Sequence, residues 1–350
     1  MFPSPVRPPF VTAIIVPTGI GASIGGFAGD ATPVMNLAAH VSDVLITHPN
    51  VANAAVFQKL PENALYVEGY ALDAFFRGEW GLQPVHGNRV GVLLDAGIPD
   101  DMRTLHLNTV RAVQAVYGVD IAGIEITGEP VQIDCIMTES GCSAGTLKNP
   151  DALLRTAGRL LEQGATAIAV LVLLPEFSDE QEELYRAGGG VDPIGGIEAV
   201  LSHWLVSRLG IPCAHAPVFP WEVARPVTDT LVDPRTAAEF IAPTFLPCVL
   251  TGLQRAPRFT PLSPPPSPPN GLTIDQLSAL IVPGDALGGV PVLSALKRRI
   301  PVLAVAENQT ILAMDAAVLP PSCRNGIISV RSYEEAVGRL VAIKLGHALR

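Results

Sequence analysis

The chain has 350 residues, enough for one large α/β domain or two moderate ones with a substantial core. Lys and Arg number 23 against 33 Asp and Glu, so the formal net charge is −10, which argues against binding nucleic acid or an anionic membrane surface. Mean hydropathy is high at +0.36. The longest apolar run, at 165–175, is nevertheless too short for a membrane span of roughly 20 residues. We therefore expect a parallel sheet buried on both faces.

The cysteines and the N-terminal residues favour a cytoplasmic location for the protein. The first ten residues, MFPSPVRPPF, contain no apolar core of the kind that a secretory signal needs. The chain has 5 cysteines, an odd number, and none of them form a CxxC pair. Reduced thiols in the cytoplasm fit this pattern better than a disulfide framework.

The predicted elements repeat one order: a short apolar strand, a loop rich in glycine or polar residues, and a helix. Strands are predicted at 12–16, 44–47, 65–69, 89–94, 121–126, 131–137, 165–174, 211–215, 247–250, 279–282 and 301–305. Helices are predicted at 50–58, 100–117, 149–163, 197–209 and 291–298. The clearest unit joins the strand at 133–137 through the helix at 149–163 to the strand at 165–174, as βαβ.

This alternation predicts a Rossmann-like α/β fold with mostly parallel sheets, helices on both faces, and two lobes around a cleft. We place an N-terminal lobe with a glycine-rich loop at 1–130 and a second lobe at 131–350. A proline-rich segment at 256–270 interrupts the second lobe as a linker or surface loop of polyproline-like backbone. The residues beyond it are expected to complete a shared sheet or lobe rather than fold alone.

Residues 12–53 organise the functional prediction, because a glycine-rich loop there joins a strand to a helix. Such a loop offers backbone N–H groups to an anion. Its spacing fits neither GxGxxG nor GxxxxGK[ST], so a standard dinucleotide site or P-loop is not expected. The ligand-binding candidates are Thr18, Gly19, Gly21, Gly25, Gly26 and Asp30. The alternatives are a tight turn that packs helix on sheet and, for Asp30, a helix cap.

Polar residues directly after the next strand form a second candidate group. His48 is a candidate general acid or base, with Asn50 and Asn53 as ligand-binding neighbours. A buried, hydrogen-bonded packing role is the alternative for His48. No HxH, HExxH or CxxC spacing occurs, so we predict no metal site, and the sequence indicates no particular cofactor.

The loop at 138–145 is a second place suited to an anion. Ser140, Gly141 and Ser143 are ligand-binding candidates, since hydroxyl and N–H groups suit a carboxylate or phosphate. Cys142, expected near a helix N-terminus, is a candidate nucleophile or proton carrier. A small residue chosen for tight packing is the alternative.

The remaining candidates follow later strands. Asp285 and Glu307 are catalytic candidates, although Asp285 would also suit a helix N-cap. Arg255 is a candidate anion clamp, and Asp192 is a candidate polar tip of a mobile excursion over the cleft. Further ligand-binding candidates are His215, Gly288, Gly289 and Asn308.

Several long blocks resemble an uncharacterised family, a domain of unknown function found in photosynthetic bacteria and plastids. These blocks are TGIGASIGGFAGDATPVMNL, LITHPNVANAA, LPENALYVEGYALD, GVDPIGGIEAVLSH and VPGDALGGVPVLSAL. The resemblance spans nearly the whole chain, except for the proline-rich insert at 257–269. It implies no activity. It supports residence in the cytoplasm or a stroma-like compartment, and the bacterial cytosol is the expected one.

We weigh three functions. The first is an enzyme that performs acid–base chemistry of the isomerase, racemase or lyase type on a small anionic metabolite, a carboxylate or phosphorylated compound. A racemase with two cysteines is a weak version, because Cys213 and Cys248 lie in apolar runs. The second is a ligand-binding or sensor protein of the same fold that performs no chemistry. The third is a scaffold that binds partners through the proline-rich segment. A homo-oligomer is possible in each case.

Overall fold

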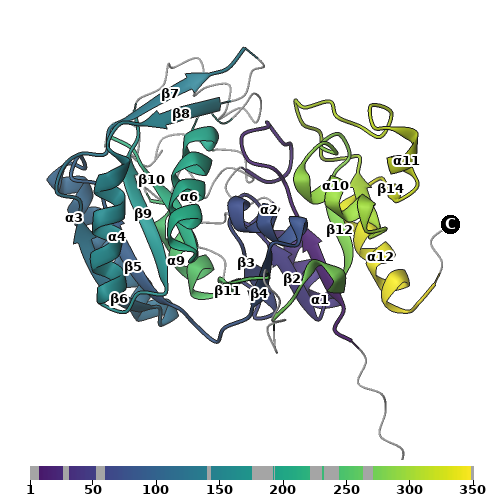
Figure 1. Ribbon diagram of the computed structural model, residues 1–350, viewed down its shortest axis with the longest axis horizontal. Coiled ribbons are helices and arrows are strands. Elements are labelled where there is room, and N and C mark those ends of the chain that lie inside the picture. Colours follow the sequence, from purple (N-terminus) through teal and green to yellow (C-terminus); the bar gives the residue numbers. More distant parts are fainter. Residues whose placement is uncertain are drawn as a thin grey trace, which may run out of the picture.

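The computed structural model describes residues 8–26, 31–52, 60–139, 143–175, 192, 194–220, 231, 244–262 and 271–347. These residues form an α/β fold whose two main sheets are parallel, as the sequence predicted (Figure 1). The central strands are buried because their apolar runs face helices on both sides. No helix within the described ranges is both long and apolar enough to cross a membrane.

The first main sheet, sheet A, has six strands and combines the two ends of the chain. Its order is β14-β13-β12-β1-β2-β3, and every pairing is parallel. The strands are β1 (Val11–Ile14), β2 (Val44–Thr47), β3 (Ala64–Tyr66), β12 (Leu277–Pro283), β13 (Val302–Val305) and β14 (Ile327–Val330). Counted along the chain, this is the strand order 3-2-1-4-5-6 of Rossmann folds.

The second main sheet, sheet C, lies between β3 and β12 in the sequence. Its four parallel strands have the order β10-β9-β5-β6. They are β5 (Arg89–Leu94), β6 (Asp120–Ile126), β9 (Ala167–Leu173) and β10 (Cys213–Val218). The predicted boundary at residue 130 falls within sheet C, because β5 and β6 lie before it and β9, which pairs with β5, lies beyond it. The strands after the proline-rich segment do complete a shared sheet, as predicted.

Helices cover both faces of both sheets. One face carries α1 (Thr32–Val41), α3 (Asp100–Tyr117), α9 (Leu246–Gln254) and α12 (Tyr333–Lys344). The other carries α2 (Gly69–Arg77), α4 (Pro150–Glu162), α6 (Gly195–Leu209) and α10 (Val290–Lys297). Each face forms one apolar cluster that runs across both sheets. In Figure 1 helix α2 lies where the two units meet, and it packs against both α6 and α10. A one-turn helix, α11 (Pro321–Arg324), precedes β14.

Two antiparallel pairs lie outside the main sheets. The first joins β4 (Trp80–Gln83) to β11 (Arg258–Pro261), so the start of the predicted proline-rich linker is a paired strand. The residues at 263–270 lie outside the described ranges. The second is a hairpin of β7 (Ile133–Met137) and β8 (Ser143–Leu147), which packs on α6.

The hairpin overturns the predicted βαβ unit. Strand β7 pairs with β8 and not with β9, which lies between β5 and β10. Ser143 therefore begins a strand, and helix α4 begins only at Pro150. The predicted loop at 138–145 thus includes the first three residues of β8, all of them small: Ser143, Ala144 and Gly145.

The predicted strand at 247–250 is the first part of helix α9. Four apolar residues in a row are compatible with a buried strand or a buried helix, and periodicity cannot separate the two. Pro247 stands in the first turn of this helix, a position where the missing N–H group costs nothing. The end of the segment is therefore a helix C-terminus, which changes the position of Arg255.

Candidate functional site

The glycine-rich loop after β1 presents backbone donors in the arrangement that the sequence suggested. Its φ angles are +73° at Gly19 and +58° at Gly21, while Ile20 between them is not in the left-handed region. Alternation of this kind turns successive N–H groups towards one side and makes a concave anion site. The N–H groups of Gly19, Ile20 and Gly21 have no hydrogen-bond partner among the described residues. We call residues 18–22 the cradle.

Two predicted site residues hold the loop from the β2 side. Nε2 of His48 accepts a hydrogen bond of 3.0 Å from Val16 N–H, and burial lowers the pKa of His48 to about 4, although this backbone bond opposes the change. Nδ2 of Asn50 donates to the carbonyls of Val16 at 2.8 Å and Pro17 at 3.1 Å. The carbonyl of Asn50 accepts from Gly26 N–H. Both side chains thus fix the backbone where the strand becomes the loop.

Asn308 holds the loop from the other side. It is 1% exposed, and its side chain accepts from Ile24 N–H at 2.9 Å and donates to the Ile24 carbonyl at 2.8 Å. It also donates to the hydroxyl of Tyr333 at 2.7 Å. Ser23 N–H donates to the carbonyl of Gln309. The loop after β13 therefore reaches across the end of β12 to the loop after β1.

Asp285 and Glu307 position this reaching segment. One carboxylate oxygen of Asp285 accepts from Thr310 N–H at 2.9 Å, and the other is buried without a partner in the described part of the chain. Glu307 accepts from Tyr333 N–H at 2.7 Å, at the start of α12. A dinucleotide would bind at the switch in strand order between β1 and β12, and here the protein's own segment bridges that point. The geometry agrees with the absence of a dinucleotide motif.

The cradle touches the second unit at a close backbone contact, which we call the seam: Thr18, Gly19, Ser143, Gly195 and Gly196. A Cβ on Gly195 would lie 3.1 Å from both N and Cα of Gly19 and from Cγ2 of Thr18. Gly196 N–H donates to Oγ of Ser143 at 2.7 Å. Only glycines allow the start of α6 to approach the cradle and strand β8 so closely. Gly19 and Ser143, predicted on separate loops, thus meet.

Asp192 belongs to the start of α6. Its carboxylate accepts from Ile194 N–H at 3.0 Å, and its carbonyl accepts from Gly195 N–H at 3.3 Å. The Asp192 carboxyl therefore lies just before α6, bonded to the N–H of its N-cap residue Ile194. Residues 176–191, the predicted excursion, lie outside the described ranges.

A pair of titratable groups, a half-buried carboxyl and a buried imidazole, lies one turn further along α6. Oε1 of Glu198 is 3.2 Å from Nδ1 of His215, which comes from strand β10. The His215 side chain is 1% exposed and that of Glu198 is 22% exposed. Nε2 of His215 is buried and has no hydrogen-bond partner among the described residues. Helix α6 is apolar on most sides, so Glu198 is an unusual residue within it.

Burial changes the proton affinity of all three groups. It raises the pKa of Glu198 to about 8. It raises the pKa of Asp192 to about 7, with a smaller contribution from the nearby Glu198. It lowers the pKa of His215 to about 3, although the Val172 backbone acts in the opposite direction. The contact between Glu198 and His215 is therefore a hydrogen bond between neutral groups near pH 7, and not an ion pair.

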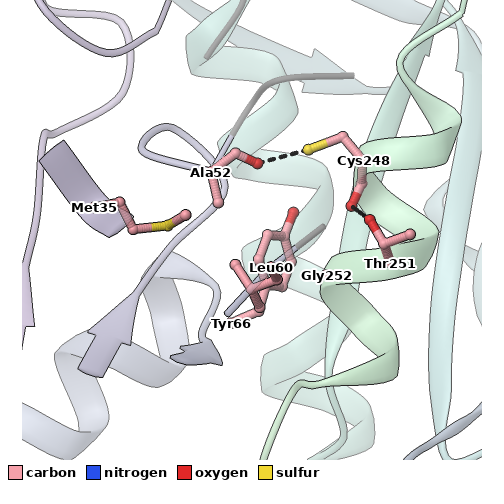
Figure 2. A pocket seen from close by; sticks show the side chains of 7 residues that line it. All are labelled: Met35, Ala52, Leu60, Tyr66, Cys248, Thr251 and Gly252. Atoms are coloured by element: carbon pink, nitrogen blue, oxygen red, sulfur yellow. Dashed lines mark hydrogen bonds between the residues drawn. The ribbon is translucent and has the colours of Figure 1, made fainter. Parts of the chain in front are cut away.

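A separate contact between the two units surrounds Tyr66. A Cβ on Gly252 would lie 2.6 Å from the Tyr66 ring, so α9 accepts the ring only at a glycine. Figure 2 shows the Cys248 thiol pointing at the carbonyl of Ala52, a distance of 2.6 Å. The space beside them holds roughly one water molecule. The Tyr66 hydroxyl is buried without a described partner. This space is too small for a metabolite.

Glu68, just beyond β3, links α2 to α6. Its Oε1 accepts from Tyr70 N–H and lies 3.0 Å from Nε2 of His203. Burial lowers the pKa of His203, but the hydrogen bond and charge of Glu68 outweigh this effect, and the net change is upward. The link is a structural hydrogen bond between α2 and α6.

Other predicted residues do not join the seam. Arg255 caps the end of α9 beside Asn88, whose side chain donates to the carbonyls of Leu253 and Ala256. This is the amino end of β5, opposite to the strand ends where the cradle lies, so Arg255 is not the predicted anion clamp. Gly288 and Gly289 form the turn before α10. The candidates Asp30, Asn53, Ser140, Gly141 and Cys142 lie outside the described ranges.

Glu198 was not among the candidates that the sequence pattern indicated. A signal was available: Glu198 is the only acidic residue in α6, and its first-turn neighbours are glycine and apolar residues. A charge at such a place is buried unless the helix end is exposed. Across the described residues, no group of three or more His, Cys, Asp and Glu side chains could hold a metal ion.

Comparisons with known proteins give relatives but no activity. A family model described as "Protein of unknown function (DUF3326)" matches residues 11–350. A Synechococcus protein named "Uncharacterized lipoprotein syc1174_c" is 44% identical over 338 residues, which cover 96% of this chain and 91% of that protein. No solved structure matches the chain. The predicted resemblance to an uncharacterised family over nearly the whole chain is confirmed.

Proposed function

The chain belongs to the DUF3326 family, and from this premise we propose that the protein is an enzyme that moves a proton on a small anionic metabolite at the seam. The observation that carries the proposal is one juxtaposition. The cradle, with unpartnered N–H groups, touches the start of α6, and α6 carries Glu198 against His215 one turn later. The proposed anion site and the proposed proton donor are therefore both at the start of α6.

The cradle supplies the binding part of the proposal. Three N–H groups at Gly19, Ile20 and Gly21 suit a carboxylate or a phosphate group. His48, Asn50 and Asn308 keep these groups in position by fixing both ends of the loop. In this reading they are positioning residues, and His48 does not exchange protons with a substrate.

The pair of Glu198 and His215 supplies the acid–base part. A carboxyl whose pKa is close to the working pH can give up and take back a proton with little free-energy cost in either direction. This favours isomerase, racemase or lyase chemistry, in which a proton leaves one atom and is added at another. Asp192 lies just before α6 and adds to the negative potential near Glu198 when ionised.

The binding part is tested with Gly21→Ala and a matched control, Gly118→Ala. Both glycines have a positive φ, +58° and +67°, so alanine strains each backbone by about 1–2 kcal/mol. Gly118 ends α3 and has open space around it. The wild type is screened by thermal shift against sugar phosphates, amino acids, hydroxy acids and keto acids. A ligand at 100 times its Kd should add about 2.7 kcal/mol of stability. That gain should vanish in Gly21→Ala and persist in Gly118→Ala.

The chemical part is tested on a compound found in this screen. In D2O the enzyme should exchange a carbon-bound hydrogen of the compound, such as one next to a hydroxyl group, for deuterium, and proton NMR measures this exchange. Glu198→Gln should abolish the exchange while the compound still binds. Binding with no exchange and no product would refute the enzyme and favour a ligand-binding or sensor protein of the same fold. A well-folded protein with no hit in the panel would refute the anion site.

We propose the cytoplasm as the location, on the basis of the odd cysteine count and the four described cysteines, which are free thiols. The relative's name contains the word lipoprotein, which describes a membrane-anchored protein. Cell fractionation decides between the two. Recovery in the membrane fraction, with release only by detergent, would contradict the cytoplasmic location.

A further inference from the structure

His215 has one nitrogen bound and one without a partner. It lies in β10, the strand at one edge of sheet C, and its ring is almost completely buried. Nδ1 contacts Oε1 of Glu198 at 3.2 Å, whereas Nε2 at the opposite end of the ring has no described partner. Buried polar atoms are nearly always hydrogen-bonded, so this nitrogen calls for a ligand atom or a water.

The two ends of the ring are chemically linked. A neutral imidazole has a hydrogen on one nitrogen and a lone pair on the other. When Glu198 is protonated, its O–H donates to Nδ1, and Nε2 then carries the hydrogen. When Glu198 is ionised, Nδ1 must donate to the carboxylate, and Nε2 becomes an acceptor. The protonation state of Glu198 therefore decides what His215 offers at its free end.

We propose that Glu198 and His215 form a proton relay in which Nε2 of His215 exchanges the proton with the substrate and Glu198 stores it. In the forward step, Nε2–H gives its proton to the substrate base while Nδ1 takes the proton of the Glu198 carboxyl. The products are the protonated substrate, the Glu198 carboxylate and the other neutral tautomer of His215. The proposal rests on the proposed function only for the identity of the proton acceptor.

The surroundings favour a relay through a ring that stays neutral. Burial holds the pKa of His215 near 3, so a charged imidazolium is unfavourable, whereas the relay never forms one. The titratable groups that interact with Glu198 are Asp192, Cys135 on β7 and Tyr66 on β3. Burial raises the pKa of the Cys135 thiol to about 11 and raises that of the Tyr66 hydroxyl well above its usual value, so both stay neutral between pH 6 and 10.

The test is nitrogen NMR of protein labelled with 15N-histidine, titrated from pH 6 to 10 without any ligand. The His215 signals are identified by their loss in His215→Gln. We expect the Nε2–H tautomer at low pH and a change to the Nδ1–H tautomer as the pH rises through about 8. In Glu198→Gln, an isosteric variant, one tautomer should persist across the whole range.

His48 is the internal control. Its Nε2 accepts from Val16 N–H, so it should remain the Nδ1–H tautomer at every pH. A single His215 tautomer throughout the titration, formation of an imidazolium, or a tautomer change that survives in Glu198→Gln would each overturn the relay. Because no ligand is used, the result is independent of the proposed function. If the tautomer changes as expected but the thermal-shift screen finds no ligand, the relay stands and only the proposed substrate class is refuted.

Discussion

Replacement of Gly196 by alanine is the most direct perturbation of the seam. Its Cβ would overlap the carbonyl group of Ser143 and lie 2.7 Å from the nitrogen of Ala144. These atoms belong to the backbone of β8, so they cannot move aside as a flexible side chain would. Strand β8 must shift away from α6, or the first turn of α6 must open.

The expected loss follows from three contributions. Overpacking against backbone costs about 1–3 kcal/mol. Weakening the bond between Gly196 N–H and Ser143 Oγ, 2.7 Å long, removes about 0.5–1.5 kcal/mol more. Alanine returns at most about 1 kcal/mol through its greater helix preference. The free energy of unfolding should therefore fall by roughly 0.5–4.5 kcal/mol.

Urea denaturation followed by circular dichroism measures this difference. The matched control is Gly158→Ala in the interior of α4, where a Cβ meets nothing within 4 Å. That variant should gain about 0.5–1 kcal/mol. If Gly196→Ala is as stable as Gly158→Ala, the close approach of α6 to β8 does not exist in solution.

Three further outcomes are expected. Between pH 4.5 and about 8 the folded state keeps a proton on Glu198 that the unfolded chain releases. The free energy of unfolding should therefore fall as the pH rises through this range, by at most about 1.4 kcal/mol per pH unit. Urea denaturation of Glu198→Gln should show a flatter dependence of stability on pH. Tyr66→Phe removes a buried hydroxyl without a described partner and should leave stability unchanged or raise it by about 1 kcal/mol. A lower melting temperature would contradict this and would indicate that a water in the neighbouring space bonds the hydroxyl. Asn308→Ala leaves the N–H and C=O groups of Ile24 without their Asn308 partner and should lower the free energy of unfolding by about 2–4 kcal/mol. Proteolysis at residues 18–26 should be faster than in the wild type. An unchanged rate of proteolysis would contradict the role of Asn308 in holding this loop.

The fold class was predictable because the strong signals are local and repeated. Buried strands such as β5 and long amphipathic helices such as α3 have the bounds that the sequence predicted. The failures occur where local pattern is ambiguous. Strand β8 carries small residues, and α9 begins with a short apolar run that either element type could contain. Pairing partners cannot be read from single segments, so the hairpin and the pairing of β12 with β1 were not predicted.

The candidate site shows the same division. The cradle was predicted because positive φ angles require glycine, and the sequence displays that requirement directly. His48 and Asn308 were chosen because they follow strands, but both turned out to hold backbone. A polar residue at a strand end can hydrogen-bond to the loop backbone or to a ligand, and only its hydrogen-bond partners in the structure distinguish the two roles. The pair of Glu198 and His215 joins a helix to a strand, a relation that no local spacing reveals.

The order of sheet A also bears on how the chain is made. Strand β1 leaves the ribosome early, yet one of its two neighbours is β12, which pairs Leu277 with Val11. Until the last quarter of the chain is synthesised, one edge of β1 has no partner, and an unpaired apolar edge invites aggregation. Sheet C is complete once β10 has been made, so it can form during this interval. The protein therefore depends on late closure of its earliest strand.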